Sequence, residues 1–161
     1  MDEFIKLVAK YAIVVPVIAA AYVFIRFTGR KDRIEFVTLL AAGGLLSLCA
    51  AFIGSRLIND PRPFVAGHFT PLLPHGNDNG FPSDHTLLAS FLGFAILRYR
   101  RGLGTAILFV AACIGIARIA AGIHHLEDII GSFIITGAAV LAVTALQRRM
   151  QRQREHSPQN G

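Results

Sequence analysis

The stretch 103–146, LGTAILFVAACIGIARIAAGIHHLEDIIGSFIITGAAVLAVTAL, decides the fold of this chain. It contains two apolar runs, 103–121 and 129–146. Each run is close to the ~20 residues that a helix needs to cross a bilayer. The polar segment 122–128 separates them. The pattern therefore predicts two antiparallel membrane-spanning helices joined by a short polar turn.

Three further apolar runs precede this pair, at 11–27, 36–57 and 86–97. The first two have spanning length, and the third reaches it only if its helix includes His85 and the region of Tyr99. The first run leads into a basic cluster, and we expect it to remain as an uncleaved helix rather than a signal peptide. The predicted fold is an all-α, polytopic membrane helix bundle with about five transmembrane helices.

The N-terminal residues 1–10 are predicted to form a short amphipathic helix in the membrane interface, because Phe4, Ile5, Leu7 and Val8 fall near one face. The composition agrees with a membrane protein. Of the 161 residues, 53% are hydrophobic and 16% charged, whereas ordinary globular chains carry about 25% charged residues. This excludes a disordered chain, a coiled coil and an ordinary soluble enzyme.

The basic residues concentrate in the segments 28–35 and 98–102 and in the C-terminal tail. With five spans, all three fall on one side, which the positive-inside rule makes the cytoplasm. The loops 58–84 and 122–128 then face the exterior. The net charge of +6 is explained by these segments, and no basic stretch carries the aromatic residues that nucleic-acid binding needs. We expect one membrane domain over 1–147 and a basic, disordered cytoplasmic tail over 148–161.

Several polar residues near the predicted outer face are candidates for function. Arg56, Arg118 and Asp128 lie at the ends of apolar runs, where charge is costly. Arginine guanidinium groups match phosphate oxygens, so a site for a polyanion is indicated. His124 and Asp128 are four residues apart and share a face on a helix. The carboxylate can then accept the imidazole Nδ1–H and leave Nε2 as a nucleophile or base.

The segment Phe81-Pro82-Ser83-Asp84-His85 points to the same place. Ser83 is a favourable N-cap for the third spanning helix, whose free amides can hold phosphate oxygens. His85 would project from the first turn of that helix into the same space.

These residues resemble the three motifs of the type-2 phosphatidic acid phosphatase superfamily, which are metal-independent integral-membrane lipid phosphatases. The matching elements are Arg62-Pro63, Pro82-Ser83-Asp84-His85 and Arg118-x5-His124-x3-Asp128. The resemblance covers about residues 50–130. It implies an enzyme without a cofactor or metal, in a bacterial cytoplasmic membrane, whose partners are membrane lipid and a lipid phosphate or diphosphate substrate.

The resemblance also implies a role for each residue. His124 is the nucleophile that takes the phosphoryl group, Asp128 orients it, and His85 protonates the leaving oxygen. Water then hydrolyses the phosphohistidine. The residues implied to bind the substrate are Arg62, Arg118 and Ser83, which hold the phosphate oxygens, together with Asp84 and Arg56.

This chain departs from the family pattern at several positions. Ser55 stands where the first motif usually has lysine, and the neighbouring Arg56 is the candidate to replace it. Asp84 stands where glycine is usual, and Ala117 where serine is usual. The family commonly has six spans, and we count five. A similar aspartate occurs in the bacitracin-resistance-type undecaprenyl-diphosphate phosphatases, which makes undecaprenyl diphosphate at the outer leaflet the leading substrate. The alternative is phosphatidylglycerophosphate or a broad range of lipid phosphates.

Two other classes of protein, a zinc hydrolase and a transporter, are alternatives to a lipid phosphatase. A zinc hydrolase built on His85, His124 and Asp128 with the intervening His125 and Glu127 lacks a His-Glu-x-x-His helix, and the arginines would repel the cation. A transporter would spread polar residues through the depth of the membrane. Here the polar residues gather at one face, which favours an interfacial enzyme.

Overall fold

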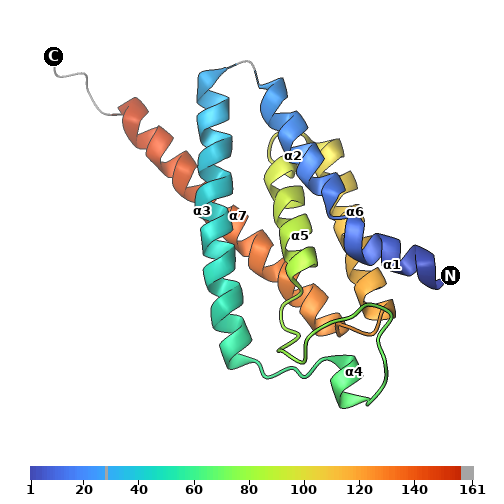
Figure 1. Ribbon diagram of the computed structural model, residues 1–161. Coiled ribbons are helices and arrows are strands. Elements are labelled where there is room, and N and C mark those ends of the chain that lie inside the picture. Colours follow the sequence, from blue (N-terminus) through green and yellow to red (C-terminus); the bar gives the residue numbers. More distant parts are fainter. Residues whose placement is uncertain (28, 157–161) are drawn as a thin grey trace.

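The computed structural model describes residues 1–27 and 29–156, and its regular elements are helices (Figure 1). No strand occurs among these described residues, so the predicted all-α fold is confirmed. The helices are α1 (Asp2–Tyr11), α2 (Val14–Arg26), α3 (Arg30–Leu57), α4 (Pro63–Ala66), α5 (Asp84–Leu97), α6 (Arg101–Ala120) and α7 (Leu126–His156).

Four segments of the described chain are long and apolar enough to cross a membrane: Asp2–Arg26, Arg30–Leu57, Arg101–Ala120 and Leu126–Arg154. Helix α5 is a fifth, shorter apolar helix. Its 14 residues extend about 21 Å at 1.5 Å per residue. It includes His85 but ends before Tyr99, so it is shorter than the sequence led us to expect.

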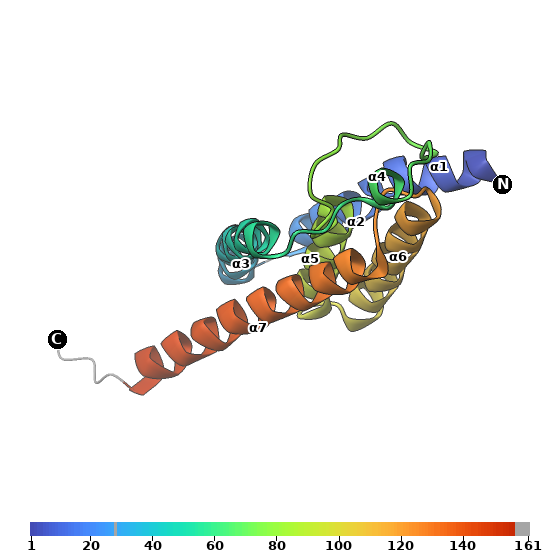
Figure 2. The ribbon, with the colours of Figure 1, turned by 90° about the horizontal axis from the view of Figure 1, so that it is seen from below.

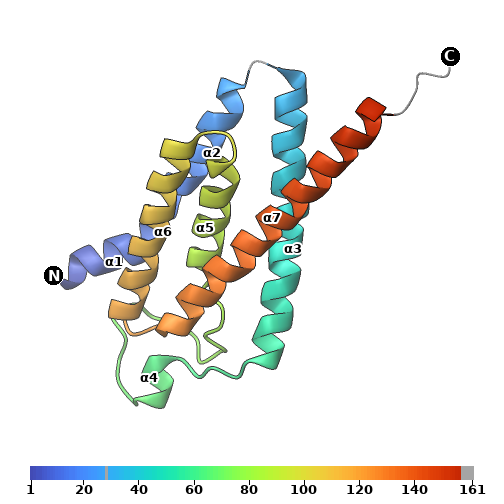
Figure 3. The same ribbon diagram turned by 180° about the vertical axis from the view of Figure 1, so that it is seen from behind.

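Helix α5 lies at the centre of the bundle, among α2, α3, α6 and α7 (Figures 1 and 3). Nine of its 14 residues are buried. Apolar side chains from the surrounding helices complete the core at the end away from α4, among them Val23, Phe36, Leu39 and Ile96. The short helix therefore serves as the axis against which the longer helices pack.

The predicted N-terminal helix is present as α1, which meets α2 at a break near Ala12. Pro16 in the first turn of α2 explains the break. Its ring has no N–H to donate, and in a continuous helix it would collide with the Ala12 carbonyl. Helix α1 consequently leaves the direction of α2 and lies against α6 (Figure 3), with Ala9 fully buried.

The basic segments meet at the end of the bundle away from α4. One crevice there brings Arg30 of α3 near Arg154 of α7, and a second brings Arg98 near Arg148. The five-span arrangement placed these segments on one side, and they do share one end of the structure.

Helix α7 continues well past Gln147, as Figure 2 shows from the loop end of the bundle. Residues 148–156, which we expected to be disordered, are helical, and 157–161 lie outside the described residues. The segment after Gln147 is rich in good helix formers and has neither glycine nor proline before Pro158. Gln147 also anchors α7 to α3, because its Nε2 donates to the Glu35 carbonyl at 3.0 Å.

Candidate active site

The loop between α3 and α5 is tied to the end of α3 by one side chain, that of Asn79. Its Nδ2 donates to the carbonyls of Ser55 and Ile58, both at 2.6 Å. Its Oδ1 accepts from the backbone N–H groups of Asp60 (3.1 Å) and Phe81 (3.2 Å). Carbonyls at a helix C-terminus have no partner within the helix, so Asn79 both caps α3 and fixes the loop.

The turn between α6 and α7 depends on Gly122. Its φ of +76° lies in the left-handed region, and a Cβ there would stand 2.6 Å from the ring of Phe69. The backbone N–H of Ile123 then returns to the Arg118 carbonyl at 3.2 Å. This turn brings His124 back beneath Arg118, six residues earlier in the chain.

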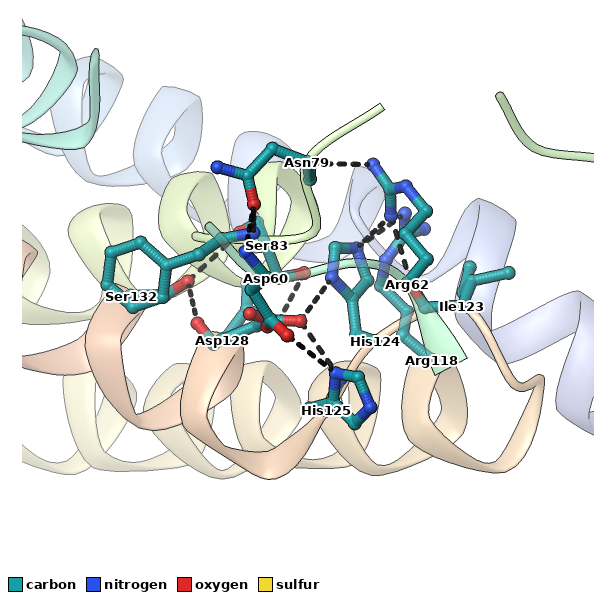
Figure 4. Close-up of polar contacts among 12 residues, drawn as sticks. Asp60, Arg62, Asn79, Ser83, Arg118, Ile123, His124, His125, Asp128 and Ser132 are labelled. Carbon is teal, nitrogen blue, oxygen red and sulfur yellow. Dashed lines mark hydrogen bonds and ion pairs between the residues drawn. The ribbon is translucent and has the colours of Figure 1, made fainter. Parts of the chain in front are cut away.

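His124 occupies the centre of the polar cluster at this end of the bundle (Figure 4). Its Nδ1 lies 3.0 Å from Asp128 Oδ2, as the four-residue spacing predicted. Its Nε2 lies 3.3 Å from Arg118 Nη2 and 3.4 Å from Arg62 Nη1. A guanidinium can only donate. Nε2 must therefore accept, and the proton sits on Nδ1 and is donated to Asp128.

The surroundings hold His124 in its neutral form. Burial is the largest cause, followed by the positive charges of Arg118 and Arg62, and together they lower its pKa to about 3. The ring is 2% exposed. A neutral imidazole whose Nδ1–H is donated to a carboxylate has a basic Nε2, the form that attacks an electrophile.

The two arginines are held by separate parts of the chain. Arg62 donates from Nε to Asp78 (3.0 Å) and from Nη1 to the Ile123 carbonyl (2.9 Å). The hydrogen bond and charge of Arg62 lower the pKa of Asp78. Arg118 donates from Nη1 to the Ala9 carbonyl of α1 at 3.2 Å. Both side chains are buried, so two fixed cationic groups flank Nε2 and form a site for an anion.

His85 and His75 line a cavity of about 290 Å³ together with Arg118 and Ile123. His85 projects from the first turn of α5, as expected, and is half-buried. His75 Nε2 lies 3.2 Å from Arg118 Nη2. Burial, Arg62 and Arg118 lower the pKa of His75. The cavity therefore opens beside Arg118, which contacts the Nε2 of His124, and two further imidazoles line its wall.

Ser83 is buried at the N-cap of α5, the predicted position, but its side chain makes no capping hydrogen bond. Its hydroxyl instead accepts from Thr86 at 3.2 Å. Its carbonyl accepts from Ser132 at 3.1 Å, and its N–H points to the Asp128 carbonyl at 3.4 Å. Ser83 thus joins α5 to α7 directly behind the cluster.

Two predicted site residues make no hydrogen bond to His124 in the described part of the chain, although the charge of Asp84 is close enough to act on both Arg118 and His124. Asp84 is exposed and lines an apolar groove with Leu48, Leu88 and Phe91, between α3 and α5. Arg56 is exposed, and its guanidinium stacks 5.1 Å from the ring of Phe52. The family's lysine position belongs to Ser55, whose hydroxyl donates to the Phe52 carbonyl at 2.8 Å. Neither Arg56 nor Ser55 is in contact with His124, so two arginines, not three, reach it.

The structure adds three residues that the sequence did not assign to the site: Asp60, His75 and Asn79. All three belong to the loop 58–83, where neither helical nor strand periodicity predicts which side chains turn inward. The only signal was their polarity in a chain with few charged residues, next to the Arg62-Pro63 motif.

An apolar helix bundle that holds a neutral histidine between a carboxylate and two arginines defines an integral-membrane enzyme acting on phosphate groups. The sequence model of the PAP2 superfamily matches residues 36–152, and this chain belongs to that superfamily of membrane lipid phosphatases. It is therefore a hydrolase.

Among its relatives is the undecaprenyl-diphosphatase BcrC of Bacillus subtilis, 31% identical over 137 residues, which are 84% of this chain and 69% of that protein. The fold is similar to the crystal structure of LpxE from Aquifex aeolicus, with a TM-score of 0.71, 21% identity and coverage of 89% of this chain and 85% of that one. It is also similar to a PAP2-type phosphatidylglycerolphosphate phosphatase of Bacillus subtilis, with a TM-score of 0.59, 20% identity and coverage of 92% and 77%.

Proposed function

We propose that this phosphatase hydrolyses undecaprenyl diphosphate to undecaprenyl phosphate at the outer leaflet, through a phosphohistidine on His124. The observation that carries the chemistry is the contact set of His124, with Asp128 on Nδ1 and two arginines beside Nε2. The choice of substrate is supported by the relative named undecaprenyl-diphosphatase at 31% identity. It is also supported by Asp84, because a similar aspartate occurs in that group of enzymes.

In the first step, Nε2 of His124 attacks the terminal phosphorus. The phosphorus–oxygen bond to undecaprenyl phosphate breaks, and His85, which is protonated by contact with the bound phosphate, supplies a proton to the leaving oxygen. Asp128 stabilises the positive charge that develops on the imidazole. Arg62 and Arg118 stabilise the charge on the equatorial oxygens. Ser83 contributes as the N-cap residue of α5, which it joins to α7 behind His124, since its own N–H is already donated to the Asp128 carbonyl.

In the second step, water attacks the phosphohistidine, and His85 takes one of its protons. The phosphorus–nitrogen bond breaks, phosphate leaves, and His124 returns to its neutral form. No metal takes part in either step, and the residues of the cluster act by attack, proton transfer and electrostatic stabilisation.

Phosphate release from purified lipids tests the substrate. The panel contains undecaprenyl diphosphate, farnesyl diphosphate, phosphatidylglycerophosphate and phosphatidic acid, each measured with and without a chelator. We expect the highest kcat/KM for undecaprenyl diphosphate and no effect of the chelator. A preference for phosphatidylglycerophosphate, or equal rates on all four, would replace the proposed substrate with the alternative. Activity that disappears with the chelator and returns with zinc would contradict the mechanism.

Labelling tests the side of the membrane. In a background in which Cys49 and Cys113 are replaced by serine, a cysteine at Asn77 should react in intact cells with a reagent that does not cross the membrane. A cysteine at Arg101 should react only after the membrane is opened. The reverse pattern would place the site on the cytoplasmic side.

A further inference from the structure

Asp128 is completely buried, yet only one of its two carboxylate oxygens is satisfied. Oδ2 lies 3.0 Å from His124 Nδ1 and accepts from the backbone N–H of His125 at 2.9 Å. Oδ1 has no hydrogen-bond partner among the described residues. A buried carboxylate oxygen without a donor is costly, so a donor that carries a proton is expected beside Oδ1.

Asp60 and His125 lie next to the carboxyl group of Asp128 (Figure 4). Asp60 Oδ1 lies 3.0 Å from His125 Nδ1. One carboxylate oxygen from each of Asp60 and Asp128 and one ring nitrogen of His125 lie within 4.8 Å of one another. Two carboxylates this close to each other in a buried site do not both ionise readily, and they titrate as a pair that shares a proton.

We propose that Asp60 is a positioning residue that holds a proton against Asp128 Oδ1 and so keeps Asp128 aligned on His124. The proposal rests on the roles assigned above to His124 and Asp128. In this arrangement one oxygen of Asp60 faces His125 Nδ1 at 3.0 Å without a hydrogen bond between them, and the other oxygen of Asp60 carries the proton and donates it to Asp128. Asp128 then accepts three hydrogen bonds.

The backbone places Asp60 firmly. Its N–H donates to Asn79 Oδ1, and its carbonyl accepts from the N–H of Gly80 at 2.9 Å. Gly80 also sits tightly against the pair, because a Cβ there would stand 3.1 Å from Asp128 Oδ2. The loop between α3 and α5, which Asn79 ties to α3, therefore holds Asp60 next to Asp128.

The charges around Asp60 give the expected pH dependence. The titratable groups that face it are Asp128 and His125. Burial and the neighbouring Asp128 raise the pKa of Asp60 above its ordinary value, against the opposing effect of His125. A raised pKa means that the proton is retained to a higher pH and lost above it. Loss of the proton would add a second negative charge behind His124 and remove the donor to Asp128, so activity should fall.

Two substitutions of Asp60 distinguish a role in which its proton positions Asp128 from a merely structural role. In Asp60→Asn the amide donates to Asp128 Oδ1 at every pH. We therefore expect the kcat of Asp60→Asn to lie within about threefold of that of the unmodified enzyme. The decrease in activity at high pH that deprotonation of Asp60 causes should be absent from its pH profile. Asp60→Leu has a similar size and no donor, and it should lower kcat by roughly ten- to a hundredfold through misalignment of Asp128. Asp32→Leu, at an exposed position near the start of α3, is the matched control and should leave kcat unchanged.

The outcomes that contradict the proposal are distinct. Asp60→Asn with the kcat of Asp60→Leu would show that a donor is not what matters. If Asp60→Leu does not fold, the pH profiles of the unmodified enzyme and Asp60→Asn decide alone, and identical profiles overturn the proposal. Inhibition of the unmodified enzyme by zinc that Asp60→Asn abolishes would assign the cluster to a cation instead. Activity retained by His124→Ala would refute the proposed function itself, independently of Asp60.

Discussion

Replacement of Arg118 by alanine should change both the pKa of His124 and the rate of phosphate release. Nη2 of Arg118 lies 3.3 Å from Nε2 of His124, and Arg118 is the stronger of the two charges that lower the pKa of His124. The drop from 6.5 to about 3 makes the imidazolium roughly 5 kcal/mol less stable than in water, at 1.36 kcal/mol per pH unit.

Coulomb's law sets the scale of the part that belongs to Arg118. Two unit charges 3.3 Å apart interact by about 5 kcal/mol at an effective dielectric constant of 20. The true share is smaller, because burial is the largest cause of the shift and Arg62 contributes as well. We therefore expect the pKa of His124 to rise by at least about one pH unit in Arg118→Ala. The value of kcat/KM should fall by about 10²- to 10³-fold, the loss seen when one preorganised donor is removed.

The pKa is measured by NMR titration of ¹³C-labelled histidines in detergent micelles, with the signal assigned from its absence in His124→Gln. Phosphate release from undecaprenyl diphosphate gives the rate. Arg118→Gln is the second variant, because its amide can still donate to the Ala9 carbonyl and so protects the packing of α1. Arg56→Ala is the control and should change neither quantity by much. An unchanged pKa in Arg118→Ala, or a greater loss of rate in Arg56→Ala, would refute this account of the site.

Three further predictions concern the acid, the turn and the pH dependence of stability. His85→Ala should slow hydrolysis of phosphatidylglycerophosphate, whose leaving group is an alkoxide, more than hydrolysis of a diphosphate, and the ratio of the two rates measures this. Gly122→Ala should lower the melting temperature in detergent, because its φ of +76° and the contact with Phe69 oppose a side chain, at a cost of roughly 2 kcal/mol. The folded protein binds a proton on His124 less readily than the unfolded chain, because its folded pKa is about 3 and its ordinary value is 6.5. Stability should therefore fall as the pH drops below about 6.5, by about 2 kcal/mol at pH 5, and His124→Gln should lack this part of the loss.

The apolar runs and the helical spacing predicted much of this structure because they are local properties of the chain. Runs of about 20 apolar residues indicated the long helices. The four-residue spacing of His124 and Asp128 predicted their contact. The length of α5 was overestimated, because a helix enclosed by other helices does not have to match the thickness of the bilayer by itself.

The contacts that the sequence did not predict all join segments far apart in the chain. The Ala9 carbonyl meets Arg118 because Pro16 turns α1 across the bundle onto α6, and Asp60 meets Asp128 through a loop without periodicity. The role predicted for Arg56 depended on a shift of one residue along α3. On a helix one residue is a rotation of 100°, which places this guanidinium over Phe52 and not over His124.

Under the proposed mechanism, the contacts of His124 explain why its Nε2 reacts only when a phosphate group is bound. The lone pair of Nε2 faces the N–H groups of Arg62 and Arg118 at 3.4 and 3.3 Å, while Nδ1 donates to Asp128. A phosphate dianion is a far stronger acceptor for guanidinium groups than a neutral imidazole is. Its binding should draw both arginines onto its oxygens and leave Nε2 facing the phosphorus. The same two side chains then serve first to keep the nucleophile covered and afterwards to stabilise the transition state, so the nucleophile becomes available only when its target is bound.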